Sequence, residues 1–382
     1  MKTTIVKLIT CAFLSITTVV CLYAVSDKLT HRQNSFHRYF PPHPILLDTV
    51  TQIKFNSYYF SGYDAVSNNI YLGNITAPLH LLKVNTQSKD TSHISVKIDS
   101  NSLKRFYAKS RISVTPPYFY LLDGVTPKLL RGNISSWNAN EFIYDNAYFN
   151  QAIPIGPKSL AIRSIDAENH ELILGKVTNK PPNVLLAPNL LEKQLDGIFC
   201  TDGSLLYNTK RSKLIYIYYY RNEYLIMDTT MQLVDKRKTI DTNSIAKIKS
   251  KAIDHYDSKT MAAPPFLVNK NSYTYKDYLL IHSNLMAKNE SKYKFGNSSV
   301  IDVYNLNTNT YDFSFYIDSF KGFKLKRFMI TDNHLLAIHH NYLVIYELNQ
   351  NWFSEMKPVS KQNKDNIAIE SGNRNTEHLY KK

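Results

Sequence analysis

Apolar residues along this chain come in short runs that are separated by turn-forming residues. In a typical stretch, Leu214–Tyr218 is apolar, Arg221 and Asn222 form a polar break, and Tyr224–Met227 is apolar again. Two apolar runs joined by a short polar turn predict a β-hairpin. Six such hairpins are predicted, with first strands that begin at residues 69, 118, 160, 214, 278 and 334. These starts lie roughly 40 to 65 residues apart, which suits one propeller blade per repeat.

Each predicted hairpin follows another apolar run, which we predict to be the innermost strand of a four-stranded unit. In chain order these runs are Tyr58–Phe60, Arg111–Val114, Ala152–Ile155, Gly197–Phe199, Pro265–Val268 and Arg327–Ile330. An outermost strand can follow most hairpins, for example at Ser92–Ile98, Val234–Ile240 and Asp312–Ile317.

The sixth unit has no outermost strand of its own, because the chain becomes polar after Phe353. A spare strand, Leu47–Phe55, lies near the other end of the chain. We therefore predict that this N-terminal strand completes the last blade and closes the ring. Alternation with a period of two places Thr51, Ile53 and Phe55 on one face of that strand, where we expect Ile53 and Phe55 to be buried.

Helical patterns are weak in the same region of the chain. Asn189–Leu195 is predicted to form a turn or two, and Ile240–Tyr256 either a short helix or a long loop between blades. Strands and helices do not alternate, which argues against a doubly wound sheet. A two-sheet sandwich and a β-helix fit the blade-length repeat less well. The predicted fold class is all-β, a six-bladed β-propeller of four-stranded antiparallel blades.

The N-terminus is basic as far as Lys7 and then runs without a charge from Leu8 to Val25. That length lies between a signal-peptide core and a minimal membrane span, so an uncleaved anchor and a cleaved signal peptide both remain open. Either segment would export the rest of the chain. An anchor would leave it membrane-bound and facing the periplasm or cell exterior, and a cleaved signal peptide would release it into the periplasm. The predicted organisation is a signal or anchor segment at 1–25, a linker at 26–44, the propeller at 45–353 and a polar, disordered tail at 354–382.

Charge and cysteine content add two constraints. The chain carries 46 Lys and Arg against 31 Asp and Glu, a net charge of +15. A field of that sign can attract acidic polymers or an anionic membrane surface, although scattered lysines also simply solvate exposed strands.

Two of the three cysteines lie in the N-terminal apolar segment, which leaves Cys200 unable to form an intramolecular disulfide in the exported part. We expect Cys200 to be a buried strand residue.

With this repeat, the chain from Leu47 to Phe353 resembles the TolB-like and NHL-like six-bladed propellers of bacterial envelopes, chiefly poorly characterised exported members. The resemblance rests on repeat length and hairpin pattern. It implies the fold and does not specify a function.

Candidate chemistry is sparse. Trp-Asp blade endings, Kelch double glycines, a sialidase Asp box and nucleotide-binding loops are all missing from the sequence. Four histidines stand near predicted strand ends: His282, His334, His339 and His340. They could converge as metal ligands, but we favour the interpretation that they lie near turns and face solvent. Four carboxylates could meet across the channel for hydrolysis, but turn chemistry is favoured; they are Asp123, Asp166, Asp202 and Asp332. No catalytic or binding residue, cofactor or metal site is assigned.

The sequence therefore predicts a non-enzymatic binding or scaffolding propeller for a protein, peptide or glycan partner in the envelope. Its expected contact element is the insertion Met286–Ser299, which contains Lys288, Lys292, Tyr293 and Lys294. The alternative is a propeller enzyme, such as a hydrolase or lyase acting on a sugar or lactone, or a redox-associated subunit, with its active site in the central channel. Nucleic acid is not an expected partner, because the chain is exported.

Overall fold

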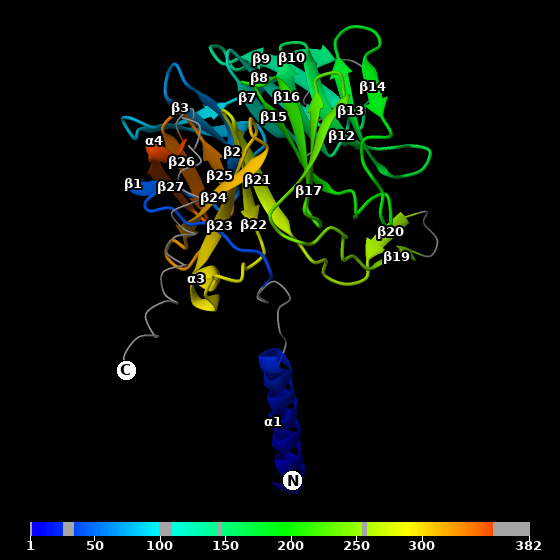
Figure 1. Ribbon diagram of the computed structural model, residues 1–382, viewed down its shortest axis with the longest axis vertical. Helices are drawn as coiled ribbons and strands as arrows, with labels where there is room; N and C mark the ends of the chain where they lie inside the picture. The colour runs from blue at the N-terminus through cyan, green and yellow to red at the C-terminus, as the bar shows by residue number, and fades with distance from the viewer. Residues whose placement is uncertain (1, 26–33, 99–108, 144–146, 254–257, 354–382) are drawn as a thin grey trace, which may run out of the picture.

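The computed structural model describes residues 2–25, 34–98, 109–143, 147–253 and 258–353, so the predicted tail at 354–382 lies outside the described residues. Short, mostly antiparallel strands are its main regular structure (Figure 1). Turn residues separate strands rich in Tyr, Leu, Ile and Val, which favour the pleated, half-buried backbone of a sheet. The three described helices are α1 (Lys2–Val25), α3 (Lys292–Asn297) and α4 (Gln350–Phe353).

The described strands form four separate four-stranded antiparallel sheets and one nine-stranded sheet, in which two further four-stranded antiparallel units are joined by a parallel bridge between their innermost strands. The first unit in chain order contains β2 (Tyr58–Asp64), β3 (Asn69–Asn74), β4 (His80–Asn85) and β5 (Thr91–Ser95), and the second β7 (Arg111–Thr115), β8 (Tyr118–Asp123), β9 (Lys128–Asn133) and β10 (Asn138–Ile143), edged by the short β6 (Lys97–Ile98). The third contains β11 (Gln151–Gly156), β12 (Ser159–Ile165), β13 (Leu172–Thr178) and β14 (Val184–Ala187), and the fourth β15 (Gly203–Asn208), β16 (Lys213–Tyr218), β17 (Glu223–Asp228) and β18 (Leu233–Lys238).

The fifth unit contains β21 (Asn269–Tyr275), β22 (Tyr278–Ser283), β23 (Ser298–Asn305) and β24 (Thr310–Asp318). The sixth contains β25 (Arg327–Ile330), β26 (His334–His339) and β27 (Tyr342–Leu348), and its outermost strand is β1 (Ile45–Gln52). A separate hairpin, β19 (Ser250–Ile253) with β20 (Ser258–Met261), lies between the fourth and fifth units.

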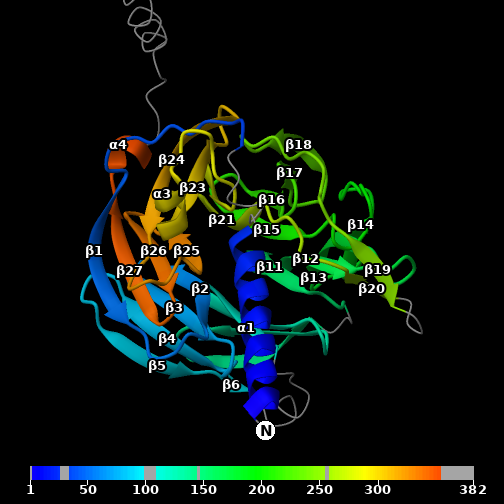
Figure 2. The ribbon, with the colours of Figure 1, turned by 90° about the horizontal axis from the view of Figure 1, so that it is seen from below.

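The innermost strands contact one another in the cyclic order β2, β7, β11, β15, β21 and β25, and β25 contacts β2 again. Figure 2 shows the sheets arranged radially around this central ring. The strands approach closely at Gly62, where a side-chain Cβ would stand 2.0 Å from the carbonyl oxygen of Val114 on β7. A glycine is therefore required at that point. The predicted all-β propeller is confirmed.

Each pair of neighbouring units shares its own apolar core. Leu280 and Phe328, for example, pack in the core between the fifth and sixth units, and Ile70 and Leu336 in the core between the first and sixth. Similar cores join the remaining neighbours around the ring. The fold is therefore held by sheet-to-sheet packing that runs continuously around the channel.

The ring closes through β1, which pairs antiparallel with β27 from Ile45 opposite Leu348 to Gln52 opposite Tyr342. This is the predicted N-terminal closing strand. Ile53 is 1% exposed and packs between the first and sixth units, as expected, but Phe55 is 46% exposed. The strand ends at Gln52 and the Ile53 amide bonds the Asn341 carbonyl at 2.8 Å, so the alternation that would bury Phe55 is lost.

Residues 34–44, expected to be part of a linker, instead pack along the fifth unit; we call them the strap. The Arg38 guanidinium is fully buried, with Nε 2.7 Å from Asp302 Oδ1 and Nη2 2.9 Å from Asp302 Oδ2, and it also bonds Glu290. Phe40 stacks on Tyr316 with ring centroids 4.5 Å apart. Burial opposes the charge of Arg38, but Asp302 and Glu290 keep its pKa above the ordinary value.

Two predicted innermost strands are wrong. Gly197–Phe199 lies in a turn in which Asp196 Oδ1 accepts the amides of Ile198 and Phe199, so β15 begins only at Gly203. Cys200 is buried as expected, but within that turn, where its thiol donates to the Asp196 carbonyl. Pro265–Val268 is likewise a connection that leads into β21.

The helical expectations have different outcomes. Asn189–Leu195 is not helical. Between residues 240 and 253 the chain is a long loop that ends in β19, which is the second of the two predicted alternatives, and residues 254–256 lie outside the described residues.

The propeller has two distinct faces, which follow from the strand directions. On one face the innermost strands begin, and there the strap enters: the Asn34 amide bonds the Met286 carbonyl at 3.1 Å. We call this the tether face. It also carries α3 and the β19–β20 hairpin, both of which lie on one side of the ring in Figure 1. The opposite face, where innermost strands turn into second strands, is the far face.

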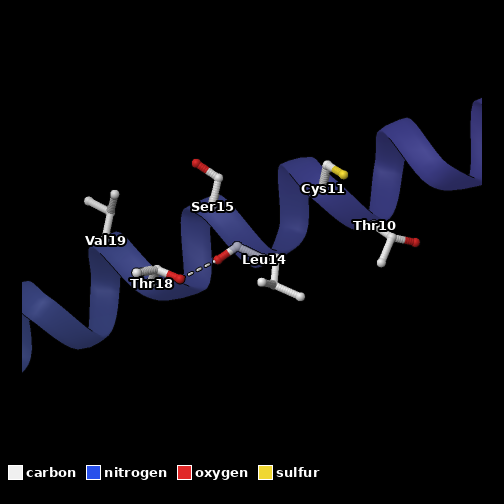
Figure 3. A pocket seen from close by; sticks show the side chains of 6 residues that line it. All are labelled: Thr10, Cys11, Leu14, Ser15, Thr18 and Val19. Carbon is white, nitrogen blue, oxygen red and sulfur yellow. Dashed lines mark hydrogen bonds between the residues drawn. The ribbon is translucent and has the colours of Figure 1, made fainter.

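Helix α1 is apolar and its described side chains are exposed. Its segment Thr4–Leu22, with a mean hydropathy of 2.2, is long and apolar enough to cross a membrane by length and composition. Figure 3 shows a hollow on its surface lined by Thr10, Cys11, Leu14, Ser15, Thr18 and Val19. The Thr18 hydroxyl donates to the Leu14 carbonyl at 2.8 Å, and those of Thr10 and Thr17 bond similarly within the helix. These polar groups are therefore satisfied without water.

Candidate functional site: the two mouths of the central channel

The far-face mouth of the channel is a cavity of about 510 Å³. It is built from the turns that end the innermost strands of the second, third, fourth and fifth units, because these turns converge around the channel axis. Tyrosines, prolines and aliphatic residues line it, among them Tyr118, Tyr120, Tyr207, Tyr273, Pro154 and Pro157. Among the described residues that line it, none carries a carboxylate, a guanidinium, an ammonium or an imidazole.

Hydrogen bonds fix the walls of this cavity. The Tyr120 hydroxyl donates to the Gly156 carbonyl at 3.3 Å, which joins the second unit to the third. The Gln151 side chain bonds both the carbonyl and the amide of Leu205, at 2.8 and 3.1 Å, and joins the third unit to the fourth. Burial raises the pKa of Tyr273 to about 12, so its phenol is neutral. The result is a preformed, uncharged hollow lined by tyrosine, proline, aliphatic and hydroxyl side chains.

A cation borders the cavity without lining it. The Arg131 guanidinium lies 4.6 Å from the Tyr118 ring and 4.3 Å from the Phe142 ring, and it bonds the Pro157 carbonyl. Cation–π contacts of this kind hold the ring of Tyr118 in place at the rim.

The tether-face mouth has the opposite character. Arginines from three units surround it: Arg111 on β7, Arg163 on β12 and Arg327 on β25. Burial raises the pKa of the Tyr59 phenol, and the charges of Arg111 and Arg327 oppose that shift. Burial likewise raises the pKa of Tyr219, and the charges of Arg163 and Arg327 oppose it. Arg327 is exposed and forms no ion pair with a described residue. This mouth is therefore positively charged.

Lys270, at the start of β21, lies on the same face, near Lys324 and His282. Burial, together with the nearby charge of Lys324, lowers its pKa to about 8. The residue is nevertheless exposed to solvent. Part of this positive charge is consequently adjustable near neutral pH.

Asp202 is the predicted carboxylate that reaches the channel. Its Oδ1 lies 2.5 Å from Arg163 Nη1, and burial raises its pKa while Arg163 opposes the shift. The other three do not join it. Asp123 and Asp166 accept amides of their own turns, and Asp332 lies exposed on the far face. Turn chemistry thus accounts for Asp123 and Asp166, whereas Asp202 pairs with a channel arginine.

The histidines depart from expectation. His282 and His339 are buried, at 3% and 0% exposure, rather than solvent-facing. His339 Nδ1 lies 2.9 Å from the Phe323 carbonyl oxygen. Burial and the charges of Lys270 and Lys324 lower the pKa of His282 to about 3, and burial lowers that of His339. His340 stacks on Phe323 at 4.4 Å, and His334 is half-buried. Within the described ranges, no group of three or more His, Cys, Asp or Glu residues is placed to hold a metal ion.

The expected contact insertion is tied down by the protein. Glu290 is buried against Arg38, Met286 and Phe295 are core residues, and the Lys294 ammonium pairs with Asp318 at 2.6 Å. Lys288, Lys292 and Tyr293 remain exposed. Sequence reasoning missed the far-face cavity, although two of its lining features are visible in the sequence: the Pro116-Pro117 pair between two apolar runs and Pro154 within the run Ala152–Ile155.

No known protein family and no curated protein matches this sequence. Several solved structures are similar in fold. A calcium-binding regucalcin from Agrobacterium tumefaciens gives a TM-score of 0.46 at 9% identity, over 82% of this chain and 94% of that chain. The nidogen/laminin complex gives 0.42 at 9% identity, over 68% and 81%. The Cps50 (Swd1) β-propeller domain of Myceliophteria thermophila gives 0.42 at 8% identity, over 78% and 99%.

Proposed function

We propose that this protein is a non-enzymatic binding propeller that takes an uncharged, apolar segment of a partner protein or peptide into its far-face cavity. The observation that carries the proposal is the lining of the 510 Å³ cavity by tyrosine, proline and aliphatic side chains. Cavities of roughly 300–1,000 Å³ with mostly apolar walls are typical of ligand sites. A rigid aromatic wall also loses little conformational entropy when it binds.

A peptide fits this lining better than a glycan does. Sugars present many hydroxyls, whereas the polar side-chain groups that line the cavity are the hydroxyls of Ser113, Thr115, Thr209 and Thr274 and of its four tyrosines, with no charged or amide side chain among the described residues of the lining. A hydroxyl that is buried without a hydrogen-bond partner costs free energy, so the hydroxyls of a bound sugar would find too few partners in this cavity. Apolar and aromatic peptide side chains would leave no such group unpaired.

We infer that α1 holds this binding domain at a membrane, outside the cytoplasm. A helix of 24 residues at 1.5 Å each exceeds the roughly 30 Å of a bilayer core. Its threonine hydroxyls are bonded within the helix, which suits a lipid environment.

The cavity can be tested by adding a charge to its rim. Thr115 lines the cavity and is exposed, whereas Thr91 is exposed on the outer strand β5. We expect full-length protein to select apolar, uncharged sequences from a peptide array, and Thr115→Lys to weaken that binding at least about tenfold, or 1.4 kcal/mol. Thr91→Lys should bind as the unaltered protein does. Selection of acidic peptides or glycans, or equal binding by both variants, would contradict the proposal.

A further inference from the structure

The tether face carries a second surface, formed by connections that project from it. Among the apolar side chains exposed on this face are four that stand beside exposed lysines: Ile245 at 64%, Tyr293 at 81%, Phe323 at 40% and Phe55 at 46%. They come from four connections: between the fourth and fifth units, within the fifth, between the fifth and sixth, and between the sixth and first. Topology places all four on one face, although they are far apart in the sequence.

Lysines surround these four side chains, which we call the apolar tips. Lys54 lies 5.3 Å from the Phe55 ring, and Lys288 and Lys292 flank Tyr293 along the chain. Lys247 and Lys249 follow Ile245, and Lys321 and Lys324 flank Phe323. All seven are exposed, and the carboxylate within the insertion, Glu290, is buried against Arg38. The surface therefore presents apolar tips in a field of positive charge.

Some of the cations on the far face are paired with carboxylates. Lys210 and Arg211 both pair with Asp277, at 2.8 and 3.2 Å, and Lys89 pairs with Asp48 at 2.8 Å. The tether face has ion pairs of its own, such as Lys294 with Asp318, and the far face has exposed lysines such as Lys158, so the tether face is distinguished by the seven exposed lysines that cluster around its apolar tips.

The length of the chain sets how far this surface can lie from α1. Asn34 is bonded to Met286 on the tether face, and nine residue steps separate it from Val25 at the end of α1. A fully extended chain covers at most about 3.6 Å per residue, so Asn34 lies within roughly 32 Å of Val25. If α1 spans a membrane, the tether face is the face that can reach the surface of that membrane.

We propose that the tether face docks on the anionic surface of the membrane that holds α1, with the lysines at the headgroups and the four apolar tips inserted between them. Basic residues near an anionic surface are attracted within a Debye length, and each contributes roughly a five-fold gain in occupancy. Aromatic side chains favour the interface between headgroups and hydrocarbon. The far-face cavity then points away from the membrane and stays open. The inference rests on the proposed membrane anchor and not on the identity of the cavity's ligand.

Hydrogen–deuterium exchange on full-length protein in lipid nanodiscs tests this orientation. The lipids would be phosphatidylcholine alone, or phosphatidylcholine with phosphatidylglycerol. We expect backbone amides at 243–249, 292–297 and 321–324 to exchange at least about five-fold more slowly in the anionic discs. That protection should vanish in 1 M salt, where the Debye length is about 3 Å. Amides around Val66, on the far face, should exchange equally in both lipids.

Charge reversal supplies the matched control. Lys288→Glu with Lys292→Glu should abolish the protection, whereas Lys158→Glu with Lys180→Glu, on the exposed far face, should leave it unchanged. Equal exchange in both lipids, or equal effects of the two double variants, would overturn the docking proposal. If the protein is instead lost from the discs, and mass spectrometry shows that α1 has been removed, the membrane anchor on which the proposal rests would be overturned. Thermal melting of each variant shows whether it is folded.

Discussion

At the scale of single residues, buried histidines couple this fold to pH. The imidazole of His282 is buried and its pKa lies near 3, so it is neutral in the folded protein at all moderate pH values. In the unfolded chain the same group has a pKa near 6.5. As pH falls through 6.5 the unfolded state binds the proton and the folded state does not, so stability is present above pH 6.5 and is lost toward pH 3.

We therefore expect acidification from pH 7 to pH 5 to lower the free energy of unfolding by about 2 kcal/mol through His282 alone. His282→Gln removes this proton and should reduce the pH dependence between those values by about 2 kcal/mol, whatever its effect at pH 7, and the part due to His339 should remain. His93→Gln, at an exposed position on β5, should leave the pH dependence as it was. Urea titrations of the three proteins at both pH values measure the difference, and parallel losses in all three would contradict the assignment.

The burial of His282 and His339 was not predictable from the sequence, for a physical reason. Both stand at the end of a second strand beside a loop, where a polar side chain is usually solvated. Here the connection that contains Phe323 and Lys324 folds back over that end, and Phe323 supplies the carbonyl contact to His339. Such a contact depends on the path of a neighbouring unit, which local alternation does not report.

At the scale of elements, β1 shows what alternation can and cannot predict. The pairing of an N-terminal strand with the last blade follows from counting strands, because an unpaired edge would otherwise remain. The point at which that strand ends depends on the turn into the first unit, where Ile53 bonds Asn341. Ile53 is accordingly buried and Phe55 is not.

These two neighbouring positions give a sharp test of closure. Ile53→Ala should lower the free energy of unfolding by about 2–5 kcal/mol, because it leaves a hole in the core between the first and sixth units. Phe55→Ala should change it by about 0.5 kcal/mol or less, because that ring is exposed. Chemical denaturation of full-length protein in detergent compares them. A larger loss at Phe55 would mean that the strand continues past Gln52.

At the scale of the whole molecule, the folded unit begins before its first strand. Hairpins and their order were predictable, since each follows from a local period of two and a turn. The strap was not, because Phe36, Arg38 and Phe40 stand in a polar, proline-containing segment whose composition is typical of linkers. Only the buried acids Asp302 and Glu290, more than two hundred residues away, give Arg38 its place.

We therefore expect a chain that begins at Pro44 to be less stable than one that begins at Asn34. The shorter chain loses Arg38 and leaves Asp302 and Glu290 buried without their cation, which costs about 3–5 kcal/mol. Its melting temperature should fall by something on the order of 10 °C. Adding Arg38→Met to the longer chain should reproduce most of the loss. Identical melting of all three chains would show that the strap contributes nothing to stability.

The strap also determines how mechanical load reaches the domain. It joins the fifth unit first, at Met286, Glu290 and Asp302, and only then passes to β1 in the sixth. Tension arriving through α1 is consequently resisted by the salt bridges of Arg38 before any of it pulls on the hydrogen bonds between β1 and β27. The closing strand, whose detachment would open the whole ring, is thereby shielded from forces exerted on the tether.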